Sequence, residues 1–554
     1  MSRQRYFRLL FGAALIAFAI GGTPVPSHAE SYQRISGEGS SWAANAIDAM
    51  RVNVKQFGIT VDYNPSGSSA GRKNWLNGTV DFAASDIPFQ FQPEDGSAPE
   101  NPAAGSYAYI PVVAGGTSFM YNLKINGQRV TNLRLSGQNV AKIFTGVLKK
   151  WNDPALQADN PGLTMPDRPI VPVVRSDGSG SSAQFSRWII HQHGALWQDF
   201  CERSGRAPAC GFTSFYPTVS GMIAQSGDLG IAGYVSQNFA EGAIGYVNYS
   251  YAIGAQFPVA KVLNKAGYYT EPTPENVAVS LLKARINSDQ NSADYLTQIL
   301  DDVYNDTDPR NYQLSSYSYF ILRTKTSSNF NEEKGKTLGA FAYYAMCQAQ
   351  QQSASLGYSP LPINLVDASL DQIRKVPGVI VQDINIKSCK NPTFSEDGHN
   401  VLADKAPQPQ DCDKQGSNQC ADGTGGAKKV KTPVKPAASG GAGTSSSGGS
   451  GANSSRTRSG VPSGSGGTAA TVVAGSSSTA DSSPVDDGFV NDVNAGNGVD
   501  TVDAVASPTV LTGSTGWSGA QTLIVLITML TLGLILGPPF MWRRLSAATS
   551  RDIA

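Results

Sequence analysis

The sequence has few charged residues and no excess of either sign. Of its 554 residues 16% are charged, and 43 lysines and arginines balance 43 aspartates and glutamates. Proteins that bind nucleic acid through its phosphates carry a surplus of positive charge, so we expect no nucleic-acid partner. Any anion that this protein binds must be recognised locally, by a few well-placed groups.

Histidine is scarce, and the cysteines lack the spacing of a metal site. The chain has only four histidines and no CxxC pair, which argues against a zinc site. His191 and His193 are interpreted as residues of a helix surface. We therefore expect no metal and no other cofactor.

The first 29 residues are predicted to be a cleavable secretory signal. Three arginines precede the apolar run LLFGAALIAFAIGG, and SHA ends at Ala29, which is the order of such a signal. No cysteine lies near the cleavage point, so an N-terminal lipid anchor is not expected.

Residues 520–542 are predicted to form a transmembrane helix. They include TLIVLITMLTLGLILGPPFM, an uncharged run of about the length that spans a bilayer. Trp517 and Trp542 flank the run and arginines follow it, so residues 543–554 should be a cytoplasmic tail. We expect a single-pass plasma-membrane protein with its folded part outside, as on a Gram-positive cell surface; a buried core helix is the alternative.

Residues 405–516 are predicted to be a low-complexity linker. The stretch is rich in glycine, serine, threonine and alanine and poor in large apolar side chains. Such a composition buries too little surface to offset chain entropy. We therefore interpret this stretch as a tether.

The cysteines of an exported protein are more often disulfide-bonded than catalytic. The six are Cys201, Cys210, Cys347, Cys389, Cys412 and Cys420. Six cysteines allow about fifteen pairings. We predict pairing between sequence neighbours, which joins the first to the second, the third to the fourth and the fifth to the sixth.

The stretch from residue 30 to residue 404 has a natural size for two α/β domains. Apolar runs such as AYIPVVAGG, PIVPVV, GAIGYVNYSY and SYFILR alternate with helical segments such as AANAIDAMRVNVKQFG. This alternation predicts largely parallel sheets. In such folds ligands bind beyond the carboxyl ends of the strands.

Three predicted strand-to-helix loops share one chemistry. They are GEGSSW at residues 37–42, NPSGSSAG at 64–71 and RSDGSGSS at 175–182. A helix start has free N–H groups and partial positive charge, so it stabilises an anion, and each serine adds a hydroxyl. Serine could instead merely cap each helix, but three similar loops favour a site for a small tetrahedral oxyanion.

Two charged positions refine this hypothesis. Arg175 can offer paired donors to an anion, and Asp177 can hold its guanidinium in place, although an ordinary surface pair is the alternative. Asp86 ends the apolar run VDFAAS. A carboxylate there suits an anion that carries a proton, as phosphate does and sulfate does not; a helix cap before IPF is the alternative.

Seven motifs in order resemble the PstS family of phosphate-binding proteins of ABC importers. They are GEGSSW, SGSSAG, VDFAASD, IFTGVLKKWNDP, RSDGSGSS, GAIGYVNYSYA and LGYSPLP. The resemblance implies a two-lobed periplasmic-binding-protein fold of type II that closes on phosphate, with hinge strands near 109–116 and 246–254. It assigns residues 30–112 and 251–404 to the first lobe and residues 113–250 to the second. It also implies ABC permease subunits as partners, and we expect a monomer.

The resemblance implies a set of phosphate ligands in this chain, with Asp177 orienting Arg175. The implied ligands are Ser41, Trp42, Ser68, Asp86, Arg175, Ser179, Gly180 and Ser181. Ser41 and Ser181 stand where threonine is common, and each keeps a hydroxyl. Trp42 replaces a phenylalanine that acts through its backbone N–H, and its larger ring could alter the pocket mouth.

Other functions fit the sequence less well. Residues 67–71 match GxSxG, the nucleophile motif of serine hydrolases, but only His191, His193 and His399 follow as candidate bases. A phosphatase lacks a metal cluster, and a stalked adhesin leaves the three loops unexplained. We therefore expect a tethered phosphate receptor rather than an enzyme, with arsenate or another protonated oxyanion as an open alternative ligand.

Overall fold

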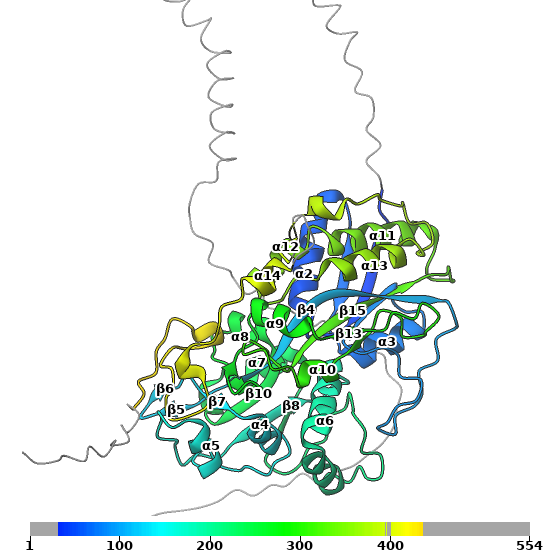
Figure 1. The fold of residues 1–554 in the computed structure, drawn as a ribbon. Helices are drawn as coiled ribbons and strands as arrows, with labels where there is room; N and C mark the ends of the chain where they lie inside the picture. The colour runs from blue at the N-terminus through cyan, green and yellow to red at the C-terminus, as the bar shows by residue number, and fades with distance from the viewer. Residues whose placement is uncertain (1–30, 390, 394, 396–399, 436–554) are drawn as a thin grey trace, which may run out of the picture. The chain divides into compact units, whose positions relative to one another are not determined.

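The computed structural model describes residues 31–389, 391–393, 395 and 400–435 (Figure 1). The predicted signal at residues 1–29, the predicted span at 520–542 and the tail at 543–554 lie outside these residues. So does the predicted linker beyond residue 435. Among the described residues, no helix is both long and apolar enough to cross a membrane.

An eight-stranded mixed sheet forms the centre of the described chain. Its strands follow the order β2 (Val61–Asn64), β1 (Ile35–Gly39), β3 (Phe82–Ser85), β15 (Ser315–Arg323), β4 (Tyr107–Tyr121), β10 (Ala243–Asn248), β8 (Val171–Arg175) and β9 (Ile223–Gln225). β1 is parallel to β2 and β3, and β8 is parallel to β9 and β10. The apolar runs predicted as strands form β4, β8, β10 and β15, which confirms the α/β class.

The long strand β4 belongs to both halves of the sheet. Its residues 107–116 pair with β15, and its residues 117–121 pair with β10. We define the first lobe by β2, β1, β3 and β15, and the second lobe by β10, β8 and β9. The strand predicted as a hinge at 109–116 is therefore the strand that the lobes share.

Two glycines in β4 allow close packing where the strand crosses between the lobes. A Cβ at Gly115 would lie 2.8 Å from the ring of Trp42, and one at Gly116 would lie 2.2 Å from the Pro272 side chain. A larger residue at either position would push these groups away. The crossing point is thus packed from both sides.

Helices pack against the sheet in both lobes (Figure 1). Those of the first lobe are α2 (Ala44–Asn53), α3 (Ser68–Leu76), α11 (Glu332–Met346) and α13 (Ile363–Ile373). Those that accompany the second lobe are α4 (Gly137–Phe144), α5 (Pro154–Asp159), α6 (Gly180–Arg203) and α7 (Gly227–Val235).

Shorter elements complete the described part. The other helices are α8 (Tyr249–Gly254), α9 (Pro274–Leu281), α10 (Asp301–Tyr304), α12 (Gln350–Ser353) and α14 (Val401–Asp404). Small sheets join β12 (Tyr269–Thr270), β11 (Lys261–Leu263) and β7 (Arg134–Leu135); β13 (Arg285–Ile286) and β14 (Gln298–Ile299); and β5 (Lys124–Ile125) and β6 (Gln128–Arg129).

All three predicted disulfides are present. Cys201 bonds Cys210, Cys347 bonds Cys389 and Cys412 bonds Cys420. Each joins cysteines that are neighbours in the cysteine order of the chain, which confirms the pairing.

The expected lobe boundary at residue 250 is too early. β11 pairs in parallel with β7, and β12 pairs with β11. The backbone N–H of Lys261 also donates to the Leu133 carbonyl at 2.9 Å. Residues 261–270 therefore accompany the second lobe, because the chain returns to the residues around β7 before it continues into β15.

Residues 405–435 are packed, contrary to the linker expected from residue 405. Nη1 of Arg134 donates to the carbonyls of Asn418 (2.7 Å) and Cys412 (3.2 Å). Thr131 donates its backbone N–H to Thr432 Oγ1 at 2.8 Å. The composition predicted disorder because this segment buries few large apolar side chains; backbone hydrogen bonds and a disulfide hold it instead.

This packing predicts that Arg134 is important for stability. Arg134 is 1% exposed, and the change Arg134→Leu would remove the donor to the buried Asp159 carbonyl and to the part-buried carbonyls of Cys412 and Asn418. We expect the free energy of unfolding to fall by about 2 to 4 kcal/mol, measured by urea denaturation. The control is Lys431→Ala, which removes an exposed ion pair with Asp422 and should cost less than about 1 kcal/mol. Equal losses for both variants would contradict this interpretation.

Candidate functional site

The first two glycine–serine loops meet at the carboxyl end of β1. Ser40 and Ser41 directly follow Gly39, the last residue of β1, and Ser68 is the first residue of α3. Gly67 donates its backbone N–H to the Gly39 carbonyl at 2.7 Å. Gly67 has a φ of 101°, a conformation that favours glycine. The first lobe therefore presents both loops side by side.

The third loop comes from the second lobe and contacts the second loop. The side chain of Ser179 caps α6, whose first residue is Gly180. Ser69 donates its backbone N–H to the Gly178 carbonyl at 3.0 Å. A Cβ at Gly180 would lie 2.6 Å from Ser68 Oγ, so glycine is needed for this approach. The structure thus brings all three loops together.

Asp86 lies between these loops, directly after β3. Its Oδ1 accepts a hydrogen bond from Ser40 Oγ at 2.7 Å, and its Oδ2 accepts one from Ser68 Oγ at 3.3 Å. Burial raises the pKa of Asp86 to about 6, although the hydrogen bond from Ser40 opposes this shift. Above this pH the carboxylate is a buried acceptor.

Arg175 ends β8 and is held by two carboxylates. Its Nε donates to Asp177 Oδ1 at 2.7 Å, and its Nη1 donates to Asp228 Oδ2 at 2.6 Å. Burial lowers the pKa of Arg175, but Asp228 and Asp177 outweigh that effect, so the net shift is upward. Nη1 also approaches Ser181 Oγ at 3.3 Å, and Ser181 Oγ lies 2.7 Å from Ser179 Oγ. The guanidinium is therefore charged and fixed at the start of α6.

Asp228 is a member of the site that sequence reasoning missed. Ser41 Oγ donates to Asp228 Oδ2 at 2.7 Å, and Asn248 donates its backbone N–H to Oδ1 at 2.7 Å. The available signal was IAQSGDLG, a fourth glycine–serine loop between a strand, β9, and a helix, α7. Ser40 was also missed, although it is part of GEGSSW.

The ring of Trp42 lies at the crossing between the lobes. Its indole Nε1 donates to Thr117 Oγ1 at 3.1 Å, and its ring packs edge-on against Tyr358 with centroids 5.9 Å apart. The residue is 1% exposed. The larger ring therefore fills the space beside Gly115 and does not lie at an exposed pocket mouth.

The two lobes contact each other around the site. Ser41, Ser68, Asp86 and Arg175 are each at most 3% exposed. Ser41 of the first lobe bonds Asp228 of the second. In this arrangement the lobes enclose the site, so a ligand can enter or leave only when they separate.

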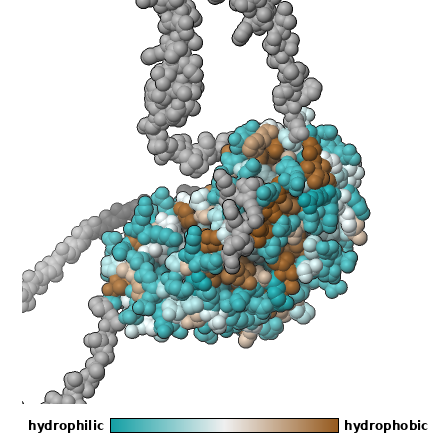
Figure 2. Space-filling model, turned by 45° about the horizontal axis from the view of Figure 1, so that its top comes forward, coloured by the Kyte–Doolittle hydropathy of each residue, from teal (hydrophilic) through white to brown (hydrophobic). Residues whose placement is uncertain are grey.

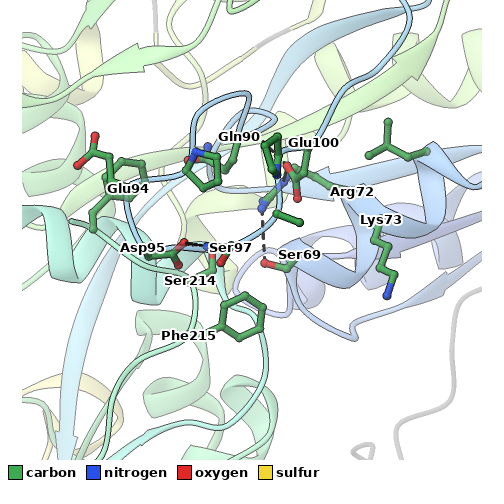
Figure 3. A pocket seen from close by; sticks show the side chains of 15 residues that line it. Ser69, Arg72, Lys73, Gln90, Glu94, Asp95, Ser97, Glu100, Ser214 and Phe215 are labelled. Carbon is green, nitrogen blue, oxygen red and sulfur yellow. Dashed lines mark hydrogen bonds and ion pairs between the residues drawn. The ribbon is translucent and has the colours of Figure 1, made fainter. Parts of the chain in front are cut away.

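A cavity of about 360 Å³ lies beside the site, with Ser69 on its wall (Figure 3). Residues of both lobes line it, among them Arg72 and Phe215. Three carboxyl-bearing residues, Glu94, Asp95 and Glu100, also line it. Arg72 pairs with Glu100, Arg206 pairs with Asp95, and Lys73 also lines the cavity, so charges of both signs lie on its wall.

The GxSxG motif lacks a histidine partner among the described residues. The serine of the motif is Ser69, whose Oγ accepts a hydrogen bond from Arg72 Nη2 at 3.4 Å, while His191 lies 3.5 Å from Asp301 and His193 packs against Trp188. His399 lies outside the described residues. The described part of the chain also contains no cluster of three or more potential metal ligands.

The raised pKa of Asp86 predicts a stability change with pH. The protonated form favours the folded state, and this contribution is complete below about pH 4 and is lost as pH rises through about 6. A rise from 3.8 to about 6 corresponds to roughly 3 kcal/mol. The variant Asp86→Asn should therefore be more stable than the wild type at pH 8 without ligand. Chemical denaturation from pH 4 to 8 checks this; identical pH profiles for the two proteins would contradict it.

Comparison with known proteins finds similarity over the part of the chain that forms the two lobes. A family model described as a PBP superfamily domain matches residues 24–349. Phosphate-binding protein PstS2 of Mycobacterium bovis is 30% identical over 357 residues, covering 62% of this chain and 87% of the relative. Phosphate-binding protein PstS of Haemophilus influenzae is 30% identical over 320 residues, covering 57% and 85%.

A solved structure with the same kind of description is more distant in sequence. It is a high-affinity periplasmic phosphate-binding protein, PfluDING, bound with phosphate, at 16% identity and a TM-score of 0.47 over 64% of this chain and 100% of that one. Both curated relatives are named phosphate-binding proteins. The region matched by the family model contains all three glycine–serine loops, at 37–42, 64–71 and 175–182. The chain belongs to the PstS family of phosphate-binding proteins, within the PBP superfamily.

Proposed function

We propose that this protein captures inorganic phosphate between its two lobes and delivers it to an ABC importer. The observation that carries the proposal is the convergence of three glycine–serine loops on one buried carboxylate, Asp86. Relatives that are named phosphate-binding proteins support the choice of ligand.

Donors from both lobes would surround the anion. The first lobe would contribute the backbone N–H of Trp42, and also the hydroxyls of Ser41 and Ser68 once their protons turn from Asp228 and Asp86 to the anion. The second contributes the guanidinium of Arg175 and the start of α6. The donors at the start of α6 are Ser179, Gly180 and Ser181. Because α6 is helical from Gly180 as far as a kink at His193, its free N–H groups and dipole favour an anion at this end.

Affinity in such a site would come from hydrogen bonds and not from net charge. Arg175 is the one cation in the cluster, whereas Asp86, Asp177 and Asp228 are carboxylates. The cluster would therefore repel an anion unless each donor and each acceptor of the cluster found a hydrogen-bond partner on that anion. Asp177 and Asp228 would hold the Arg175 guanidinium in place, and the N–H groups of Arg175 that they leave free would donate to the ligand.

Asp86 would select for a protonated ligand. Near neutral pH phosphate keeps a hydroxyl that can donate to the carboxylate, whereas sulfate would place one acceptor against another. Arsenate also carries such a proton, so it remains a competing ligand.

The proposal includes membrane tethering, which the uncharged run within residues 520–542 and the glycine- and serine-rich stretch before it support. The predicted signal at 1–29, the span at 520–542 and the linker beyond residue 435 lie outside the described residues. A tether would raise the effective concentration of the receptor near a permease.

Selectivity provides the first test. Wild-type protein should bind phosphate and reject sulfate in isothermal titration at pH 8. Asp86→Asn can donate to a sulfate oxygen, so its sulfate affinity should rise by at least about tenfold. The control Asp95→Asn changes another buried carboxylate, one that accepts from Thr213 Oγ1 at 2.6 Å, and should keep the wild-type selectivity. Failure of the wild type to bind phosphate would refute the proposed function.

The pH dependence of sulfate binding provides the second test. If sulfate needs the protonated form of Asp86, its affinity for the wild type should rise roughly tenfold per unit as pH falls from 8 to 6 and then level off. This follows from the pKa of about 6. Asp86→Asn should show a flat profile over the same range. A flat wild-type profile would show that Asp86 does not control sulfate rejection.

A further inference from the structure

We infer that Gln184 determines ligand selectivity by coupling lobe closure to the position of Asp86. Gln184 lies on α6 of the second lobe, and its Nε2 donates to the backbone carbonyl of Asp86 in the first lobe at 2.9 Å. The inference rests on the proposed function, because it concerns how the same site discriminates between oxyanions.

The first lobe holds most of Asp86 by itself. Ser40 and Ser68 bond its carboxylate, and its backbone N–H donates to Ser68 Oγ at 3.3 Å. Gln298 Nε2 lies 3.3 Å from the Asp86 carbonyl, but it makes a shorter contact of 3.0 Å with the Tyr317 carbonyl. The closer of the two donors to the Asp86 carbonyl is therefore Gln184, from the opposite lobe.

Helix α6 contacts Asp86 through two residues that lie one helical turn apart. A Cβ at Gly180 would lie 2.8 Å from both Cβ and Oδ2 of Asp86, and Gln184, four residues later, reaches its carbonyl. Residues four apart lie on one face of a helix. The first turn of the same helix carries Ser181, a proposed phosphate ligand. When the lobes close, the approach of α6 would therefore both bring its first turn to the anion and fix the position of Asp86.

The hydrogen bonding of Gln184 favours a functional role over a structural one. The residue is 8% exposed, and its Oε1 has no hydrogen-bond partner among the residues that the structure describes. A buried acceptor without a partner is unfavourable, so an apolar side chain would serve packing better. By contrast, Gln298 uses both ends of its amide, since its Oε1 accepts from the Tyr317 backbone N–H at 2.7 Å.

The physical consequence concerns the freedom of the carboxylate. With its carbonyl fixed from the second lobe, Asp86 cannot turn away from an acceptor on the ligand, so sulfate meets the full acceptor–acceptor penalty. Without Gln184 the residue could relax, which would soften this penalty while weakening phosphate. Loss of Gln184 should therefore change the ratio of the phosphate affinity to the sulfate affinity, and not only the two affinities in proportion.

The test compares Gln184→Met with a matched glutamine on the same helix. Gln192 Nε2 also donates to a residue outside α6, Asn305 Oδ1, at 3.2 Å, but on the exposed side. Phosphate and sulfate affinities of the full-length wild type, Gln184→Met and Gln192→Met are measured by isothermal titration. We expect the phosphate-to-sulfate affinity ratio to fall on the order of fivefold or more for Gln184→Met and to stay unchanged for Gln192→Met.

The outcomes separate this inference from the proposed function. If the wild type binds phosphate but Gln184→Met keeps the wild-type ratio, the inference is wrong and the proposed function stands, even if both affinities fall in proportion. If the wild type binds no phosphate, both are wrong. Gln184→Asn, which keeps the amide but is one methylene too short to reach, gives the same readout should Gln184→Met fail to fold.

Discussion

The site depends on one constraint: its charged side chains are buried, so each of them needs a hydrogen-bond or ion-pair partner. Asp86 is 2% exposed, and so is Arg175. Burial pushes the pKa of Asp86 upward to about 6, against the hydrogen bond from Ser40. Such groups are stable only if donors and acceptors match around them. The glycines and serines of the three loops supply donors at close range without adding charge.

The same constraint explains how the fold is used. Ser41 of the first lobe donates to Asp228 of the second, and Gln184 of the second lobe donates to the Asp86 carbonyl of the first, so these hydrogen bonds form only when the lobes meet. β4 is shared by both lobes and packed at Gly115 by Trp42. A single continuous strand therefore joins the two halves of the site.

Sequence reasoning found the parts of the site that local chemistry dictates. The loops at 37–42, 64–71 and 175–182 could be predicted because glycine and serine at a helix start have a recognisable chemistry. It missed Asp228, since only the fold brings this residue to Arg175 and Ser41, which lie 53 and 187 positions away in the sequence. Likewise the packing of residues 405–435 rests on backbone hydrogen bonds, which composition does not reveal.

Gln184 illustrates why the remaining features escape prediction from a single sequence. Nothing near it marks it as different from Gln192, eight residues on along the same helix. The difference arises because Gln184 is buried against the Asp86 carbonyl whereas Gln192 makes an exposed contact with Asn305, and the packing of α6 decides which is which. A buried amide with one unsatisfied end is then the physical sign of a role, because packing alone would favour an apolar residue there.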